Sequence, residues 1–264
     1  MQILVDIGNT RIKWAEVEDG RLANVGNAVH RDSRERALAS FAAALPKRVT
    51  RAIVANVAGD AIGRDLSELM HIHSRITPEF VAVRAEQFGV RCAYDDPSRL
   101  GVDRWIAVLA AHHLAPGAAC VIDAGTAVTF DAVDARGQHL GGLILPGPRL
   151  LASALDRNTN AIGVTQAPGA RPSGLDLLGK STNAAVGNGA MLALTGALER
   201  AIAAVQGSLE ERPKVYLTGG DADALHGWLE SDVDLRRDLV LEGLALFSDA
   251  PPGAHLQPKA TPNA

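Results

Sequence analysis

Apolar and polar positions at the start of the chain predict three consecutive strands joined by two turns. QILVDI (2–7) is apolar and rich in β-branched residues, and GNT (8–10) has the composition of a turn. RIKWAEV (11–17) alternates between apolar and polar positions, and RLANVGNAV (21–29) returns as a further strand after a second turn. The N-terminus therefore predicts a strand–turn–strand–turn–strand unit.

Helical spacing and short buried runs account for the remainder of the first half. Ser33 precedes apolar positions at helical spacing and is a candidate N-cap for a helix over 33–45. The following segments predict a buried strand, a helix, a strand and a strongly apolar helix, in the order RAIVANV (51–57), GDAIGRDLSELMHI (59–72), EFVAV (79–83) and DRWIAVLAAHHLA (103–115). This succession is typical of an α/β domain.

The opening pattern returns in the second half of the chain. AACVIDAGT (118–126) is a strand followed by a turn, and AVTFDAV (127–133) and QHLGGLIL (138–145) are two further strands. Asp6 and Asp123 each stand in an Asp-x-Gly sequence after an apolar strand, 117 positions apart (123 − 6). That spacing is about one domain length, so the repeat indicates duplication of a whole α/β domain.

The segments after the second repeat predict helices and one more strand: PRLLASALDR (148–157), VGNGAMLALTGALERAIAAVQ (186–206) and KVYLTGGDADALHGWL (214–229). We therefore expect one domain over 1–116 and a second over 117–248. The last stretch, 249–264, is rich in proline and polar residues, which predicts a disordered tail.

Composition and charge argue against some classes of protein, but they do not indicate a particular activity. The chain has 264 residues, 47% of them hydrophobic, and a net charge of −4 from 26 basic and 30 acidic residues. Such a balance gives no electrostatic footprint for nucleic acid and no basic patch for a membrane. Cys92 and Cys120 lack metal-type spacing, and neither a signal peptide nor a run of about 18 apolar residues is present. We expect a soluble, cytoplasmic protein with reduced thiols.

The two Asp-x-Gly turns carry the candidate chemistry. A carboxylate at the end of a buried strand is a metal ligand, and the glycine allows close approach to the backbone. The Asn or Thr that follows supplies hydrogen-bond donors, so each turn is a candidate phosphate cradle. Two such turns facing each other across a cleft would hold the phosphates of one nucleotide. Ordinary hairpin turns are the alternative for a single copy.

Two further segments have a functional and a structural interpretation. In LTGGDA (217–222), a strand that enters Gly219 and Gly220 offers a flat backbone surface to a base or ribose. In RLGVDRW (99–105), Asp103 is either an N-cap or a general base, with Arg104 beside it for an anionic substrate. The histidines of HIH (71–73) and HH (112–113) lack partners at metal-ligand spacing, so packing or surface roles are expected.

Five motifs in order resemble one family: DIGNT (6–10), GVDR (101–104), DAGTAVTFD (123–131), GGLILPG (141–147) and STNAAVGNG (181–189). Together they are similar to type III pantothenate kinases. The resemblance implies a fold of the actin, hexokinase and sugar-kinase superfamily, with duplicated ribonuclease-H-like domains around a nucleotide cleft. It also implies the transfer of a phosphoryl group from ATP to pantothenate, the first step towards coenzyme A.

The resemblance also implies roles for residues at matching positions. ATP phosphates would be bound by the loop residues Asp6, Ile7, Gly8, Asn9, Thr10, Arg11, Ile12 and Lys13, and by Thr126 in the second loop. Asp6 would face Mg²⁺, and Asp123 would hold a monovalent cation, K⁺ or NH₄⁺. Asp103 would be the general base. Pantothenate would be bound by Tyr94, Gly101, Val102, Asp103 and Arg104, and by Thr182 from the partner subunit of a homodimer whose candidate interface is the helix over 186–206.

Three other functions remain as alternatives at this point. A kinase of the same superfamily that acts on a sugar or an acetate-like acid is the nearest, although a sugar site would need several Asn, Asp and Glu side chains. A non-catalytic nucleotide-binding regulator would have no need of the base at Asp103. A purely structural α/β protein would leave the duplicated motif unexplained.

Overall fold

The structure is a computed structural model that describes residues 1–158 and 171–253. It contains two compact units. Unit 1 comprises Met1–Gly89, Tyr94–Ala110 and the described chain from Leu239 onwards, and unit 2 comprises Val90–Ala93 and Ala111–Asp238. The expected domain boundaries at 116 and 248 stay predictions, and the compact units differ from them chiefly because residues from Leu239 onwards join unit 1. Most of the predicted disordered tail, 254–264, lies outside the described residues.

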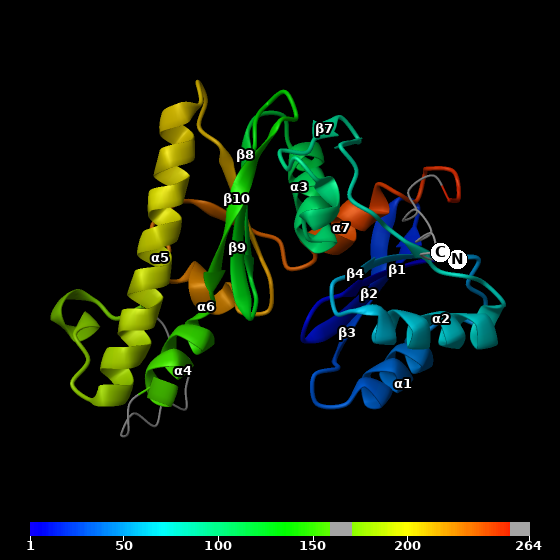
Figure 1. Cartoon of the computed structure of the whole chain (residues 1–264), viewed down its shortest axis with the longest axis horizontal. Helices are drawn as coiled ribbons and strands as arrows, with labels where there is room; N and C mark the ends of the chain where they lie inside the picture. Colours follow the sequence, from blue (N-terminus) through cyan, green and yellow to red (C-terminus); the bar gives the residue numbers. More distant parts are fainter. Residues whose placement is uncertain (159–170, 254–264) are drawn as a thin grey trace, which may run out of the picture. The chain divides into compact units, whose positions relative to one another are not determined.

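Unit 1 is built on a five-stranded sheet with helices on both faces (Figure 1). The strand order is β3-β2-β1-β4-β5; β1–β2 and β2–β3 are antiparallel, whereas β1–β4 and β4–β5 are parallel. Its elements are β1 (Gln2–Ile7), β2 (Arg11–Glu18), β3 (Arg21–Val29), α1 (Arg34–Ala44), β4 (Arg51–Asn56), α2 (Asp60–Ser74), β5 (Glu79–Phe80), η1 (Pro97–Arg99) and α7 (Leu239–Ala245), with α3 (Val102–Leu114) running into unit 2.

Unit 2 repeats the same sheet. Its strand order is β10-β9-β8-β11-β12, with β8–β9 and β9–β10 antiparallel and β8–β11 and β11–β12 parallel. Its elements are β8 (Ala119–Ala124), β9 (Ala127–Val133), β10 (His139–Pro146), α4 (Pro148–Asn158), η2 (Gly174–Leu177), α5 (Thr182–Ser208), β11 (Lys214–Thr218), α6 (Ala222–His226) and β12 (Val233–Leu235). A short ladder, β6 (Glu86–Gln87) with β7 (Val90–Arg91), completes the described strands. The predicted duplication of an α/β unit is confirmed by this match of order and direction.

Local chemistry explains why the predicted elements form where they do. Ser33 is the N-cap of α1, and its hydroxyl accepts a hydrogen bond from Arg36 N at 3.3 Å. Of the predicted strand over 79–83, only Glu79 and Phe80 form β5, because the chain leaves the sheet edge after the Val81 N–H bonds to Val54 O. The last apolar segment, GLALFS (243–248), begins inside α7.

Along the central strands, successive side chains point to opposite faces of the sheet, and this alternation decides which face Asp6 and Asp123 occupy. In β1, Ile3, Val5 and Ile7 belong to one buried cluster with residues of α1 and α2, which lie side by side (Figure 1). Successive residues of a strand point to opposite faces, so Asp6 points to the face on which α7 packs. In β8, the even-numbered residues 120–124 pack with α5, so Asp123 likewise points away from that helix.

Helices α3 and α7 of unit 1 pack at very short range. A Cβ on Gly243 of α7 would overlap the carbonyl oxygen of Ile106 in α3. Glycine at this position lets the two backbones touch, and any side chain would push α3 away from α7. Because α3 begins at Val102, this contact fixes the helix that carries Asp103 and Arg104 within unit 1.

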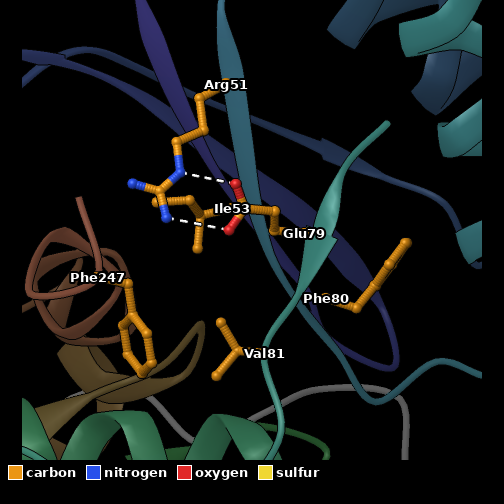
Figure 2. A pocket seen from close by; sticks show the side chains of 6 residues that line it. All are labelled: Arg51, Ile53, Glu79, Phe80, Val81 and Phe247. Atoms are coloured by element: carbon orange, nitrogen blue, oxygen red, sulfur yellow. Dashed lines mark hydrogen bonds and ion pairs between the residues drawn. The ribbon is translucent and has the colours of Figure 1, made fainter. Parts of the chain in front are cut away.

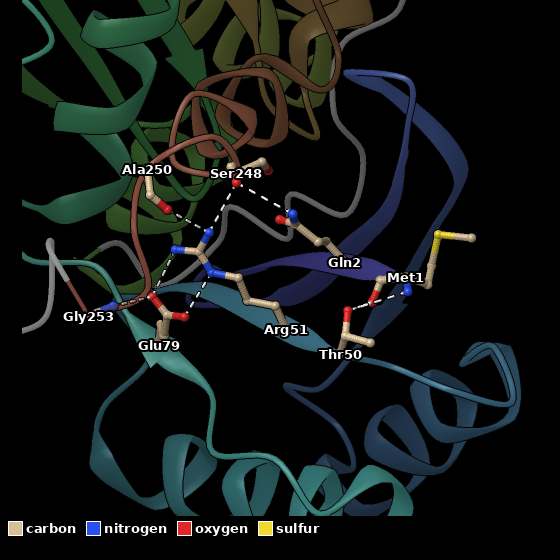
Figure 3. Close-up of polar contacts among 8 residues, drawn as sticks. All are labelled: Met1, Gln2, Thr50, Arg51, Glu79, Ser248, Ala250 and Gly253. Atoms are coloured by element: carbon tan, nitrogen blue, oxygen red, sulfur yellow. Dashed lines mark hydrogen bonds and ion pairs between the residues drawn. The ribbon is translucent and has the colours of Figure 1, made fainter.

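Arg51 ties the C-terminal segment to the sheet of unit 1. Its guanidinium binds both carboxylate oxygens of Glu79, at 2.8 and 3.0 Å, and donates to the carbonyls of Ser248 and Ala250 (Figure 3). Gly253 N–H also donates to Glu79, at 3.0 Å. A small pocket beside this cluster is otherwise lined by Ile53, Phe80, Val81 and Phe247 (Figure 2). It contains none of the predicted site residues.

Candidate active site

The first Asp-x-Gly loop, which is the predicted phosphate loop of unit 1, is a tight connection between β1 and β2. Gly8 N–H donates to Arg11 O at 3.0 Å, and the Asp6 and Lys13 backbones are paired directly across the two strands. Their side chains are therefore neighbours on one face of the sheet. Ile7 and Ile12 are fully buried, so only their backbone atoms are available to a phosphate. Asn9 is exposed at the tip, and Arg11 donates to Asn27 Oδ1 at 2.9 Å.

The second loop, in unit 2, has the same construction between β8 and β9. Gly125 N–H donates to Ala127 O at 3.1 Å, and Gly147 N–H donates to Thr126 O at 3.0 Å. A Cβ on Gly147 would lie 2.6 Å from Thr126 O and 2.7 Å from Gly125 O. The loop is therefore held by direct backbone contact with the residue that follows β10, and that contact requires glycine.

Gly219 leaves a polar cradle beside Asp123. Its φ is +100°, and a Cβ on it would overlap both Asp123 Oδ1 and the carbonyl oxygen of Ala124. Two oxygens thus converge on the space that the missing side chain leaves open. A carboxylate and a carbonyl oxygen are the donors that hard cations prefer, so these residues fit the monovalent cation expected at Asp123.

The predicted substrate residues of unit 1 are brought together at the start of α3. Asp103 Oδ1 accepts a hydrogen bond from Arg104 N at 2.8 Å, and a Cβ on Gly101 would lie 2.7 Å from that oxygen. Arg104 is only 7% exposed, and its Nη1 donates to the Tyr94 hydroxyl at 3.2 Å. Val102 is buried. Gly101 therefore lets the Asp103 carboxylate fold back over the helix terminus.

The N-cap interpretation of Asp103 is wrong. Helix α3 begins at Val102, so Asp103 lies inside its first turn, and Trp105 N–H already donates to Gly101 O at 3.0 Å. The carboxylate nevertheless lies at the helix N-terminus, where backbone N–H groups favour negative charge. Asp103 is half-buried.

Asp131, the last residue of the DAGTAVTFD motif, has a structural role in unit 2. Its Oδ1 lies 3.1 Å from His139 Nε2, and both side chains are almost completely buried. Ala93 N–H donates to His139 Nδ1 at 3.4 Å, so Nδ1 is the acceptor nitrogen and Nε2 carries the proton that Asp131 accepts. Through this bond the pair positions Ala93, the residue before Tyr94 in the chain.

The described residues contain no group of three or more His, Cys, Asp or Glu side chains arranged to hold a metal ion. Mg²⁺ in phosphoryl-transfer sites takes one or two carboxylates and completes its shell with phosphate oxygens and water. A single carboxylate at Asp6, at the end of a strand and beside the phosphate loop, fits that donor set.

Thr182 and several exposed apolar side chains lie on unit 2. Thr182 is exposed at the first turn of α5, after Ser181, whose hydroxyl accepts from Ala184 N at 3.2 Å. Exposed apolar side chains occur on edge strand β10 and on α4 and α5, namely Leu140, Leu143, Ile144, Leu150, Leu155 and Leu192. The interface predicted on α5 is not tested by this single chain.

The histidines of HIH and HH and the two cysteines are the remaining candidates, and their surroundings fit surface or packing roles. His71 and His73 are exposed on α2. Burial and the neighbouring His113 lower the pKa of His112. Both cysteines are free thiols, and burial raises the pKa of Cys120 to about 12. In the parts of the chain that the structure describes, none of the helices has the length and apolar character needed to cross a membrane.

Sequence reasoning missed three residues that shape the loops: His30, Gly147 and the cradle role of Gly219. His30 Nε2 lies 2.6 Å from Gly8 O, and it follows β3 just as Gly147 follows β10. Superposition of the two repeats along the sequence, carried on to the residue after the third strand, would have paired His30 with Gly147.

Comparisons with known sequences identify the relatives of this chain. Residues 2–204 match the family model described as type III pantothenate kinase. A type III pantothenate kinase from Nitrosococcus oceani is 35% identical over 250 residues, which cover 93% of this chain and 92% of that protein. One from Pseudomonas paraeruginosa is 37% identical over 251 residues, with 93% of this chain and 98% of that protein covered.

Solved structures that resemble the chain have lower identity and show the fold alone. A protein assigned to the Baf family of transcriptional activators, from Campylobacter jejuni, has a TM-score of 0.58 and 18% identity, covering 92% of this chain and 94% of that one. A protein assigned as a 2-dehydro-3-deoxygalactonokinase, from Sinorhizobium meliloti, has a TM-score of 0.57 and 16% identity, covering 95% and 100%. The expected sugar-kinase-like, duplicated α/β fold is therefore confirmed.

Proposed function

Because the chain belongs to the type III pantothenate kinase family, phosphotransferases that phosphorylate pantothenate in coenzyme A biosynthesis, we propose that Asp103 is the general base of this reaction. The observation that carries the proposal is the cluster of Asp103, Arg104 and Tyr94 at the start of α3. It offers a carboxylate, a cation and a hydroxyl at one place in unit 1, which suits a substrate with a hydroxyl at one end and a carboxylate at the other.

Asp103 takes the proton of the attacking hydroxyl. Its Oδ1 accepts a hydrogen bond from Arg104 N–H, which fixes the carboxylate at the start of α3, where it would accept the proton of the substrate hydroxyl. The α3 N-terminus favours the negative charge that a base needs. Phosphoryl transfer depends mainly on positioning and charge neutralisation, so a fixed carboxylate within hydrogen-bond reach is sufficient.

Arg104 binds the carboxylate of pantothenate. A guanidinium that is almost buried pairs more strongly with a carboxylate than an exposed one, because water screens it less. The Tyr94 hydroxyl accepts from Nη1 and holds the planar group in one orientation. Gly101 and Val102 complete the site by allowing the Asp103 carboxylate to fold back and by anchoring α3.

The two Asp-x-Gly loops bind ATP. The loop from Asp6 to Lys13 contacts the phosphates of ATP, and Thr126 of the second loop contacts ATP as well. Asp6 holds Mg²⁺, whose charge offsets that of the phosphates, and Asp123 holds K⁺ or NH₄⁺ in the cradle beside Gly219. The family's use of ATP supports this assignment, as does the donor set at each loop.

The active form is a homodimer in the cytoplasm, in which Thr182 reaches the pantothenate site of the partner. The exposed apolar side chains of β10, α4 and α5 support this part of the proposal, since a surface of that kind is normally covered. Size-exclusion chromatography with light scattering tests it, and a monomer at micromolar concentration that retains full activity would overturn it.

The test of the function is an ADP-release assay with ATP, Mg²⁺ and pantothenate, run in potassium and then in sodium. Turnover that needs pantothenate supports the kinase, and dependence on potassium supports the cation at Asp123. Asp103→Asn should keep nucleotide and pantothenate binding but lose about 10²–10⁴ in kcat, because the amide cannot accept the proton. A kcat within a few-fold of wild type would show that Asp103 is not the base.

A further inference from the structure

Residues 30 and 31, which follow β3, form hydrogen bonds to the Gly8 and Thr10 carbonyls of the first Asp-x-Gly loop. His30 Nε2 lies 2.6 Å from Gly8 O, and the backbone N–H groups of His30 and Arg31 donate to Thr10 O at 3.0 and 3.4 Å. A carbonyl oxygen only accepts hydrogen bonds, so Nε2 must carry a proton and donate it. All these atoms belong to unit 1, and His30 is half-buried.

The hydrogen bond to Gly8 O sets the direction of the next amide. The Gly8–Asn9 peptide is trans, and in a planar trans peptide the C=O and the following N–H point in opposite directions. With Gly8 O turned to His30, the Asn9 N–H points away from the His30 ring. Within residues 1–158 and 171–253, no hydrogen bond engages this N–H, and Asn9 is exposed.

We propose that His30 is a positioning residue for ATP: it holds the Gly8–Asn9 peptide so that the Asn9 N–H faces the phosphates. This inference rests on the proposed binding of ATP by the first loop. A donor that is already oriented needs no reorganisation when the anion arrives, so its full interaction strength contributes to binding. Without the ring, the glycine peptide is free to rotate, and the amide loses its fixed direction.

The experiment compares His30→Ala and His30→Gln with wild type and with His73→Ala. The glutamine amide places an N–H donor where Nε2 lies, so it should restore the bond to Gly8 O. His73 is an exposed histidine of the same unit whose one side-chain hydrogen bond within the described residues is to its neighbour Ser74, at 2.7 Å, and it serves as the matched control. The readouts are KM for ATP, KM for pantothenate, kcat, thermal stability and the Kd of Mg–ADP by calorimetry.

We expect His30→Ala to raise KM for ATP and the Kd of Mg–ADP about tenfold, roughly the worth of one hydrogen bond to a charged group. KM for pantothenate should stay within about twofold, His30→Gln should recover most of the loss, and His73→Ala should match wild type. A Kd for Mg–ADP that is unchanged in His30→Ala would overturn the proposal. Parallel increases in both KM values with a lower melting temperature, uncorrected by glutamine, would also overturn it by showing a general structural role.

Failure of the proposed function would look different. If wild type binds Mg–ADP but shows no turnover with pantothenate, the assigned substrate is wrong, whereas the calorimetric comparison of the His30 variants still decides the positioning role. If wild type shows pantothenate-dependent turnover and His30→Ala binds Mg–ADP normally, the function stands and the inference about His30 fails.

Discussion

The two Asp-x-Gly loops have the same backbone construction, but different groups hold them in place. In each unit the carbonyl of the residue after the aspartate accepts from the chain beyond the fourth strand: Ile7 O from Val57 N at 3.0 Å, and Ala124 O from Asp221 N at 2.8 Å. In each unit the loop threonine carbonyl accepts from the residue after the third strand, His30 or Gly147. The duplication therefore extends to individual backbone hydrogen bonds.

The two loops differ in how they contact the residue after the third strand, which is His30 in unit 1 and Gly147 in unit 2. The first turn closes from Gly8 to Arg11, three positions apart, and the second from Gly125 to Ala127, two positions apart. The shorter turn brings Gly125 O so close to residue 147 that a Cβ would collide with it. The longer turn leaves room for a side chain, and the His30 ring makes a hydrogen bond to the corresponding carbonyl, Gly8 O. One extra residue thus converts a backbone contact into a side-chain contact.

The largest expected difference between the two loops is the effect on activity of replacing their aspartates, Asp6 and Asp123. Asp6→Asn should reduce kcat by on the order of 10²–10³, because removal of the carboxylate weakens the charge neutralisation on which phosphoryl transfer depends. Asp123→Asn should reduce activity less and abolish the difference between potassium and sodium. Activity assays over a Mg²⁺ titration in each salt measure both effects. Equal losses in the two variants, with an unchanged response to potassium, would remove the assigned division of roles.

Gly147→Ala should destabilise unit 2 by about 1–3 kcal/mol, because the new methyl group cannot avoid the carbonyls of Thr126 and Gly125. Gly196→Ala is the matched control: it lies exposed on α5 with open space around its Cβ position, and it should gain about 0.5–1 kcal/mol. Urea unfolding measures both. Equal stability of the two variants would contradict the close contact described for the second loop.

The smallest effect concerns Cys120, on the strand that leads into the second loop. Its raised pKa, about 12, and its complete burial keep the thiol protonated and inaccessible at pH 8, so iodoacetamide should modify Cys92 first. The native state holds this proton while an unfolded thiol, with a pKa near 9, loses it, so Cys120 lowers stability as pH rises from about 9 to 12. Peptide mass spectrometry follows the alkylation. Rapid modification of Cys120 in the folded protein would show that β8 opens readily.

The strands and turns of both repeats were predictable because their signals are local. An apolar β-branched run followed by Asp-x-Gly specifies a strand that ends in a tight turn wherever it occurs, and Ser33 before an amphipathic run specifies a helix start. The cluster of Tyr94 and Arg104 needed the family resemblance, since the segment between them has no regular period.

The amino-acid sequence by itself determined the duplicated frame, the order of strands and helices, and the placement of a carboxylate at the end of each first strand. The tertiary structure alone decided that His30 bonds to a loop 22 residues away, that Gly147 must lack a side chain, that Asp131 pairs with buried His139, and that α7 packs with the first sheet. The physical reason is the separation along the chain over which each interaction acts. Periodicity and turn chemistry act between neighbours along the chain, whereas these contacts depend on strand pairing and sheet faces that bring distant residues together.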